Sequence, residues 1–236
     1  MKIEVLFPEV CNLYGDLANI RYLKRSFKNL EIIETKLTDE PYFMKHTPTL
    51  IYMGTMTERS QELVIEKLSK YKKRLKELID KNVHFLITGN AFEIFGKEIL
   101  CEDGKVIKCL NFYDMTAKRD MMHRFNSLYV GKFEDIEIVG FKSQFTHSYT
   151  NKKFNPLFKT IRSCGINPDN MDEGVRINNF MATYVIGPLL ILNPYFTKYL
   201  AKELGIKDTT LAFEEAAIDS YEYRLNEYKQ KKNIYY

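Results

Sequence analysis

The sequence predicts a three-layer α/β domain with a mostly parallel central sheet. Apolar runs such as KIEVLF, TLIYMG and HFLITG alternate with segments whose apolar residues recur at helical spacing. The runs are almost continuously apolar, which is typical of strands buried on both faces of a parallel sheet. At 236 residues, of which 45% are hydrophobic, the chain is long enough to bury a core without disulfides or metals. We therefore expect residues 1–236 to form one domain.

The N-terminal half supplies the parallel layer. Strand KIEVLF is followed by a helix over residues 16–27, with Asp16 as its expected N-cap. Strands EIIETKL and TLIYMG come next, and a helix begins shortly after them, where Thr55 and Glu58 match a capping box. The lysine-rich segment 66–82 reads as a surface helix with an apolar side made of Leu68, Tyr71, Leu75 and Leu78. Strand HFLITG then leads into another helix.

The C-terminal half is predicted to be more antiparallel. The segments GKVIKCLNFYDM and EDIEIVGFKSQFTHSY resemble strands of a second sheet layer, and GVRINNFMATYVIG resembles a strand pair that returns to the core. The segments NPYFTKYLAKELGI and TLAFEEAAIDSYEYRLNEY are predicted to be helical. In such a domain, binding or catalysis is expected at the carboxyl ends of the parallel strands.

Composition narrows the function classes. The formal charge is only +4, and the lysines of residues 66–82 are interleaved with Glu and Asp, so we expect a solvated helix face and no nucleic-acid partner. No apolar run reaches the ~18 residues of a membrane span. The cysteines are too far apart for a disulfide framework or a zinc site, and suggest a cytoplasmic protein with no metal or other cofactor: Cys11, Cys101, Cys109 and Cys164.

Three strand ends carry candidate chemistry. After the first strand, LFPEVCNLYGDLANI crowds polar side chains around a glycine, namely Asn12, Tyr14, Asp16, Asn19 and Arg21. The segment MGTMTERSQ would present backbone N–H groups to an anion, although Thr55 and Met56 suit a glycine-type loop poorly. In HFLITGNAFEIFG, a strand turns into a helix as in a nucleophile elbow, but Gly89 at the bend has no side chain with which to attack.

Five segments in order, over residues 4–194, resemble the class I glutamine amidotransferase domains of the cobyric acid synthase (CobB/CobQ-like) type, most closely the glutaminase subunits of lipid II isoglutaminyl synthases. LFPEVCNLYGDLANI is similar to the opening segment FPDLLNLYGDRGNI of that family. MGTMTERSQ lies where the family has a Gly-Gly-Gly-Gln-Asp loop, and ITGNAFEIFG where it has Cys-Gly-Gly-Tyr-Gln. VGFKSQFTHSY resembles Gly-Tyr-Glu-Asn-His, and ATYVIGPLLILNP resembles Thr-Tyr-Leu-His-Gly-Pro-Leu-Leu followed by Asn-Pro. The resemblance implies a flavodoxin-like fold.

The resemblance also implies that the reaction machinery has been replaced. The nucleophilic cysteine of the family falls on Gly89, and its base histidine falls on Ile186. In the family, the cysteine attacks the glutamine amide carbon and the histidine protonates the departing ammonia. Neither glycine nor isoleucine can do this. Glycines of the oxyanion-hole loop are replaced by Thr55 and Met56, and the pair after the nucleophile by Asn90 and Ala91.

Three hypotheses follow. The first is a catalytically inactive subunit or regulator of a Mur-ligase-like synthetase, the class of partner to which active relatives supply ammonia for amidation of a peptidoglycan precursor. The second is a module that binds glutamine, glutamate or a related amino acid in a remnant pocket, lined by Tyr14, Asp16, Asn19, Gly54, Thr55, Asn90, Ser143, Gln144 and His147. The third is an active glutaminase with a relocated nucleophile, for which Cys11 with His147 as its base is the candidate.

Overall fold

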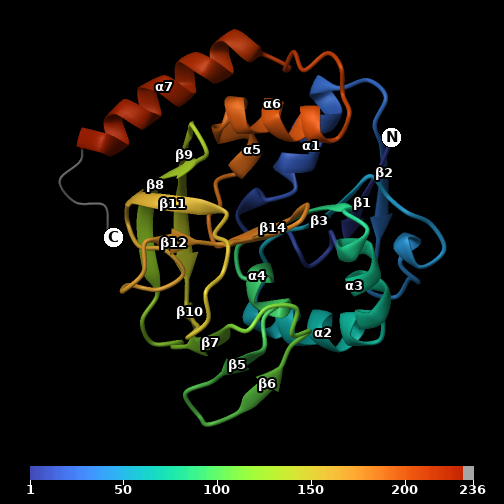
Figure 1. Ribbon diagram of the computed structural model, residues 1–236, viewed down its shortest axis with the longest axis vertical. Coiled ribbons are helices and arrows are strands. Elements are labelled where there is room, and N and C mark those ends of the chain that lie inside the picture. Colours follow the sequence, from blue (N-terminus) through green and yellow to red (C-terminus); the bar gives the residue numbers. More distant parts are fainter. Residues whose placement is uncertain (231–236) are drawn as a thin grey trace.

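A six-stranded sheet forms the middle layer of the computed structural model, which describes residues 1–230 (Figure 1). Its strands are β1 (Lys2–Leu6), β2 (Glu31–Thr35), β3 (Leu50–Met53), β4 (His84–Thr88), β13 (Val175–Ile177) and β14 (Phe180–Thr183). They lie in the order β13-β14-β4-β3-β1-β2, and all neighbouring pairs are parallel except β13 with β14. The predicted mostly parallel sheet is confirmed, with the 174–187 segment returning to it as a strand pair.

Helices cover both faces of this sheet. Figure 1 shows three of them above it, namely α1 (Ala18–Ser26), α5 (Leu189–Leu192) and α6 (Pro194–Glu203). Three others lie below it, namely α2 (Glu58–Ser69), α3 (Lys72–Asp80) and α4 (Ala91–Ile94). Side chains of β3 alternate between the layers, because Leu50 and Tyr52 join the core on the α1 side and Ile51 and Met53 join the core on the α2 side. The three-layer prediction is therefore confirmed.

Two further sheets are mostly antiparallel. One has the order β12-β11-β8-β9 and comprises β8 (Phe125–Phe133), β9 (Ile136–Gln144), β11 (Phe158–Arg162) and β12 (Asp172–Glu173). The other has the order β10-β7-β5-β6 and comprises β5 (Glu98–Leu100), β6 (Val106–Lys108), β7 (Thr116–Arg119) and β10 (Thr146–Tyr149). Helix α7 (Glu214–Gln230) packs Tyr221 and Leu225 on β8 and β9. Short 3₁₀ turns occur at Leu13–Gly15 and Tyr42–Met44.

Local details differ from the sequence prediction at both expected helix caps. Helix α1 has Leu17 at its N-cap, with no side-chain cap, because the carboxylate of Asp16 points inward and is engaged elsewhere. The N-cap of α2 is Thr57 rather than Thr55: its hydroxyl accepts a hydrogen bond from the N–H of Ser60 at 3.2 Å. In both cases the expected capping side chain, Asp16 or Thr55, makes tertiary hydrogen bonds instead. A residue one or two positions later then takes the N-cap position.

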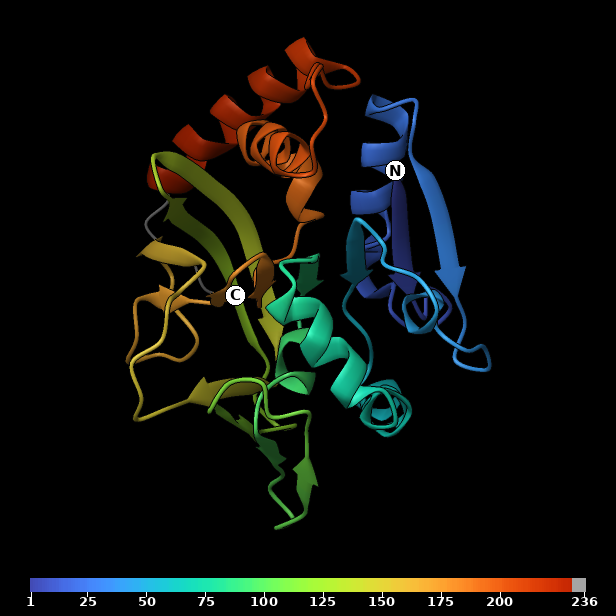
Figure 2. The ribbon, with the colours of Figure 1, turned by 45° about the vertical axis from the view of Figure 1, so that its right-hand side comes forward.

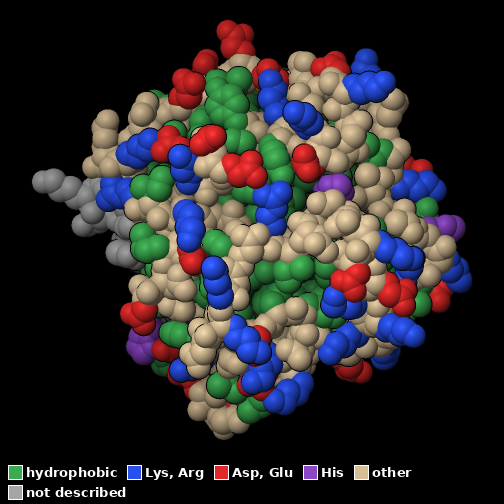
Figure 3. Space-filling model, viewed as in Figure 1, with side chains coloured by type: hydrophobic (Ala, Val, Ile, Leu, Met, Phe, Trp, Pro, Cys, Tyr) green, Lys and Arg blue, Asp and Glu red, His purple; other side chains and the backbone are tan. Residues whose placement is uncertain are grey.

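The lysine-rich segment forms two helices rather than one. The helical pattern is interrupted at Tyr71, whose φ of −111° and ψ of 8° lie outside the helical region. Leu68, Leu75 and Leu78 are buried as predicted. Figure 3 shows Lys and Arg side chains interspersed with Asp and Glu at the lower right, over α2 and α3. None of the helices in the described part of the chain has the length and apolarity needed to cross a bilayer.

Candidate functional site

The carboxyl ends of β1, β3, β4 and β14 lie at one edge of the central sheet, because these strands are parallel. The segments that leave this edge are those that the sequence singled out. Residues 7–17 follow β1, residues 54–57 follow β3, and Gly89 and Asn90 join β4 to α4. Ile186 follows β14 and forms an antiparallel bridge with Phe141 of β9 through two backbone hydrogen bonds of 3.0 Å. The expected strand-to-helix bend is thus present at Gly89.

The bend at Gly89 has no room for a side chain. Gly89 has a φ of +63°, in the left-handed region that favours glycine. An ideal Cβ placed on it would lie 2.8 Å from Cγ2 and 2.9 Å from Cβ of Thr55, and closer still to Oγ1. Thr55 is itself buried, with 3% of its surface exposed, and Ile186 is 1% exposed. The space directly beside Gly89 is therefore occupied by Thr55.

Thr55 is held in this position by the buried carboxylate of Asp16. Oδ2 of Asp16 accepts hydrogen bonds from the N–H of Thr55 at 2.9 Å, from its hydroxyl at 2.7 Å, and from the hydroxyl of Thr88 at 2.6 Å. Burial raises the pKa of Asp16, and the hydrogen bonds from Thr88 and Thr55 oppose that rise. The carboxylate of Asp16 thus holds in place both Thr88, which precedes Gly89 in the sequence, and Thr55, which lies beside Gly89 in space.

Asn19 and Tyr52 complete this network. The Asn19 amide donates to Oδ1 of Asp16 at 3.2 Å and to the Tyr52 hydroxyl at 3.0 Å, and its oxygen accepts from the N–H of Leu190 at 2.8 Å. The Tyr52 hydroxyl donates to the backbone oxygen of Asp16 at 2.8 Å. Asp16 and Asn19 are 1% and 0% exposed, so these two predicted pocket residues face one another inside the protein.

The backbone N–H groups after β3 are also engaged. In strand-to-helix hydrolase sites, the oxyanion is held by the N–H that follows the nucleophile and by a second N–H from a neighbouring loop. Here the N–H of Met56 donates to Oδ1 of Asn90 at 3.0 Å, and Nδ2 of Asn90 donates to the Met56 oxygen at 2.8 Å. Because Asp16 takes the N–H of Thr55, neither loop donor at positions 55 and 56 is free for an oxyanion. Gly54 is equally enclosed, since a Cβ there would lie 2.8 Å from the oxygen of Cys11.

The remaining predicted pocket residues lie apart from the buried network. The hydroxyls of Tyr14 and Ser143 are 3.0 Å apart, and Ser143 also donates to Oδ1 of Asn126 at 2.8 Å. Tyr14 is 41% exposed, so this pair is accessible to solvent. Gln144 donates to the backbone oxygen of Thr146 at 2.5 Å and lies 3.5 Å from Nδ1 of His147.

Burial shifts the pKa of both Cys11 and His147. Cys11 is fully buried, with its sulfur 3.9 Å from that of Met56, and burial raises the pKa of its thiol far above the usual range. Burial, reinforced by Lys142, lowers the pKa of His147 to about 4, which makes the imidazole a weak base. No hydrogen bond joins Cys11 and His147 within residues 1–230. All four cysteines are free, and no cluster of three or more His, Cys, Asp or Glu suited to a metal ion occurs in the described residues.

Sequence reasoning missed a second buried polar cluster directly behind the bend. Gln61 of α2 donates to the backbone oxygen of Asn90 at 2.6 Å and to Oε2 of Glu93 at 2.9 Å, and accepts from Arg119 at 2.5 Å. Burial raises the pKa of Glu93 to about 7, and its Oε1 has no hydrogen-bond partner among residues 1–230. The signal available in the sequence was a single carboxylate in the otherwise apolar stretch NAFEIFG.

Comparison with known proteins points to one family. The family model for the CobB/CobQ-like glutamine amidotransferase domain matches residues 2–192. The chain is 26% identical over 211 residues to the subunit GatD of lipid II isoglutaminyl synthase (glutamine-hydrolyzing) from Staphylococcus aureus strain N315, covering 89% of this chain and 86% of the relative.

Solved structures agree on the fold. A crystal structure of a glutamine amidotransferase superposes with a TM-score of 0.56 at 10% identity, covering 86% of this chain and 98% of that one. A glutamine amidotransferase from Thermotoga maritima superposes with a TM-score of 0.50 at 10% identity, covering 98% and 86% respectively. At such low identity these two matches establish the fold alone, which is the predicted one.

Proposed function

Because the chain belongs to the CobB/CobQ-like glutamine amidotransferase family, we propose that it is a non-catalytic, glutaminase-like subunit of a Mur-ligase-like amidating synthetase. One observation carries this proposal. At the bend where the resemblance predicts a nucleophile, Gly89 has no side chain, and Thr55 occupies the space that a side chain would need. Covalent hydrolysis of an amide requires a nucleophile, an oxyanion site and a base.

The rest of the site supports the loss of glutaminase chemistry. The two loop N–H groups that would be candidates for an oxyanion hole are bonded to Asp16 and Asn90. The position predicted for the base is Ile186, which is buried and bridged to Phe141. The donors and acceptors of Asp16, Thr55 and Asn90 pair with protein groups here, which leaves the two loop N–H groups engaged within the protein.

The partner is inferred from the relative. The curated protein GatD is a subunit of a glutamine-hydrolyzing synthase, and the alignment to it spans most of both chains. A subunit that keeps this fold can keep a docking surface after its own reaction is lost. We propose that the synthetase in such a complex takes ammonium from solution rather than ammonia released from glutamine.

The experiment is to purify the protein from its source together with any synthetase that co-elutes with it. Glutamate release from glutamine should not exceed that of the buffer, while amidation by the complex should depend on ammonium. Cys11→Ser should change neither rate, and glutamine should not raise the melting temperature of the isolated chain, because Thr55 occupies the space beside Gly89. Glutamate release that Cys11→Ser abolishes would establish the relocated nucleophile instead, and stabilisation by glutamine would establish the binding module.

A further inference from the structure

The open edge of the central sheet is formed by β2, which pairs only with β1 in the described part of the chain (Figure 2). The N–H of Glu31 donates to the backbone oxygen of Met1 at 2.9 Å, and the backbone oxygen of Thr35 accepts from the N–H of Phe7 at 2.7 Å. The backbone groups of the odd-numbered residues of β2 therefore point toward β1. Backbone groups alternate along a strand, and those of Ile32 and Glu34 therefore point outward. The strand EIIET contains neither proline nor a bulge that would block further pairing.

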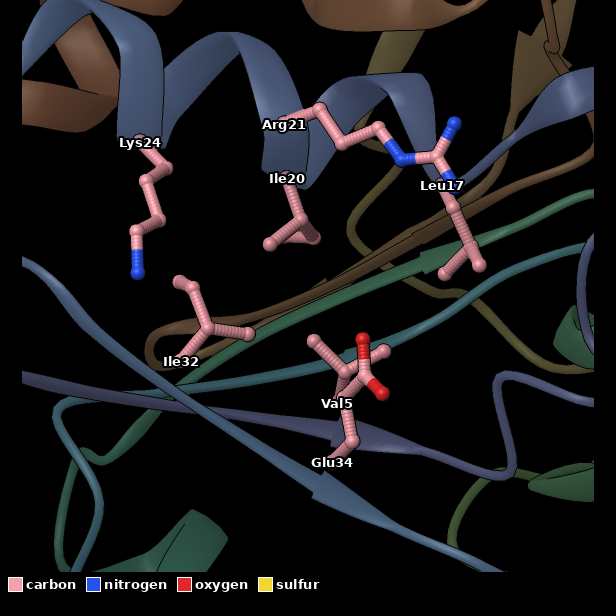
Figure 4. A pocket seen from close by; sticks show the side chains of 7 residues that line it. All are labelled: Val5, Leu17, Ile20, Arg21, Lys24, Ile32 and Glu34. Atoms are coloured by element: carbon pink, nitrogen blue, oxygen red, sulfur yellow. The ribbon is translucent and has the colours of Figure 1, made fainter.

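A cavity of about 370 Å³ runs beside this edge, between β2 and α1. Val5 and Ile32 of the sheet and Ile20 of α1 face one another across its apolar interior, and Arg21, Lys24 and Glu34 also line it (Figure 4). Figure 4 shows Lys24 extending from α1 toward Ile32 of β2. The side chains of Lys24 and Glu34 are exposed, and neither has a hydrogen bond or ion pair within residues 1–230. Ile32 and Glu34 thus contribute twice. Their backbone N–H and C=O groups point away from the sheet at its edge, and their side chains form part of the cavity wall.

We propose that β2 pairs antiparallel with β2 of a second copy of the chain, across a two-fold axis at Ile33. This register sets Ile32 opposite Glu34 of the second copy and Glu31 opposite Thr35, so no carboxylate faces another. Glu34 of the second copy then lies beside Ile32 and below Lys24. The two-fold axis repeats this contact, so the dimer contains two pairs of Lys24 with Glu34 of the other copy. Ile33, half-buried on the other face, meets Ile33 of the second copy. Lys24 and Glu34, which have no ion-pair partner within residues 1–230 of their own chain, become paired in the dimer, and this complementarity favours a second copy over an unrelated segment.

The pairing is isologous and closes on itself, so it yields a dimer with one continuous sheet rather than a fibre. It uses the edge of the sheet, away from the bend at Gly89, and does not depend on whether the chain hydrolyses glutamine. Dimerisation through β2 and hydrolysis of glutamine can therefore be tested independently of each other.

A charge-swap experiment tests the register. By size-exclusion chromatography with light scattering, the wild-type chain should have twice the mass of one chain. Lys24→Glu and Glu34→Lys should each weaken association at least about fivefold, since each variant turns two opposite-charge pairs into two like-charge pairs. An equimolar mixture should dimerise again, because its two pairs are both complementary. A wild-type monomer at the highest soluble concentration, or a mixture that stays monomeric, would overturn the proposal.

A disulfide gives a second, geometric test. In the proposed ladder, Ile33 and its copy form a non-hydrogen-bonded pair, whose Cα atoms lie about 4.5 Å apart, within disulfide reach. In a background of Cys101→Ser and Cys109→Ser, Ile33→Cys should therefore cross-link on mild oxidation. Glu31→Cys, exposed on the same strand, serves as the control and should not, because it lies opposite Thr35. Equal cross-linking of the two variants would refute the register.

Discussion

Crowding between Thr55 and position 89 can be measured as a coupling free energy of unfolding. Gly89→Ala adds a Cβ at a φ of +63°, and that Cβ would lie 2.8 Å from Cγ2 of Thr55. The left-handed backbone costs an alanine roughly 1–2 kcal/mol, and overpacking costs about 1–3 kcal/mol more. We expect Gly89→Ala to lower the free energy of unfolding by about 2–5 kcal/mol.

The matched control separates the two terms. Gly104 has a φ of +83°, and no other part of residues 1–230 lies within 4 Å of an added Cβ, so Gly104→Ala should cost only the backbone term of roughly 1–2 kcal/mol. In a Thr55→Gly background, the cost of Gly89→Ala should fall to the same level, a coupling of about 1–3 kcal/mol. Urea unfolding of the four chains of the cycle provides the measurement. An unchanged cost of Gly89→Ala without Thr55 would refute the claim that Thr55 fills this space.

Two buried ionisable sites, Glu93 and the Lys142–Glu173 pair, give further predictions. Burial raises the pKa of Glu93 from 4.5 to about 7, so its contribution to stability is fully present below about pH 4.5 and is lost as pH rises through 7; relative to Glu93→Gln, the wild type should lose on the order of 3 kcal/mol over that range, measured by urea unfolding at several pH values. Lys142 and Glu173 form an ion pair with both side chains fully buried, so Lys142→Met should cost about 3–5 kcal/mol, and adding Glu173→Gln should restore part of that loss in thermal unfolding. A flat Glu93 profile, or a double variant no more stable than Lys142→Met, would contradict these assignments.

The layers could be predicted because they depend on hydrophobic periodicity. Continuous apolar runs such as TLIYMG became buried parallel strands, and the alternation with helices fixed the three-layer order. Cap positions were not predictable to the residue: Asp16 has the chemistry of an N-cap, but three donors from distant segments compete for its carboxylate more effectively than α1 does.

The site was predictable in position but not in contents. Parallel strands bring their carboxyl ends together, which placed Gly89 and residues 54–57 at one edge. That Thr55 enters the space beside Gly89 depends on side-chain packing between segments more than thirty residues apart in sequence, which no local pattern records. Gln61 and Arg119 were missed for the same reason, since Gln61 bonds to Glu93 and to Arg119, and the three residues come from different elements.

The most direct test of the central claim is covalent labelling with the diazoketone analogue of glutamine, which traps an amidotransferase nucleophile. The account predicts that the intact protein, analysed by mass spectrometry with its partner bound, gains no stoichiometric adduct, because Gly89 cannot attack and Cys11 is buried with a raised thiol pKa. A single adduct per chain that glutamine competes away and that peptide mapping places on Cys11 would contradict it.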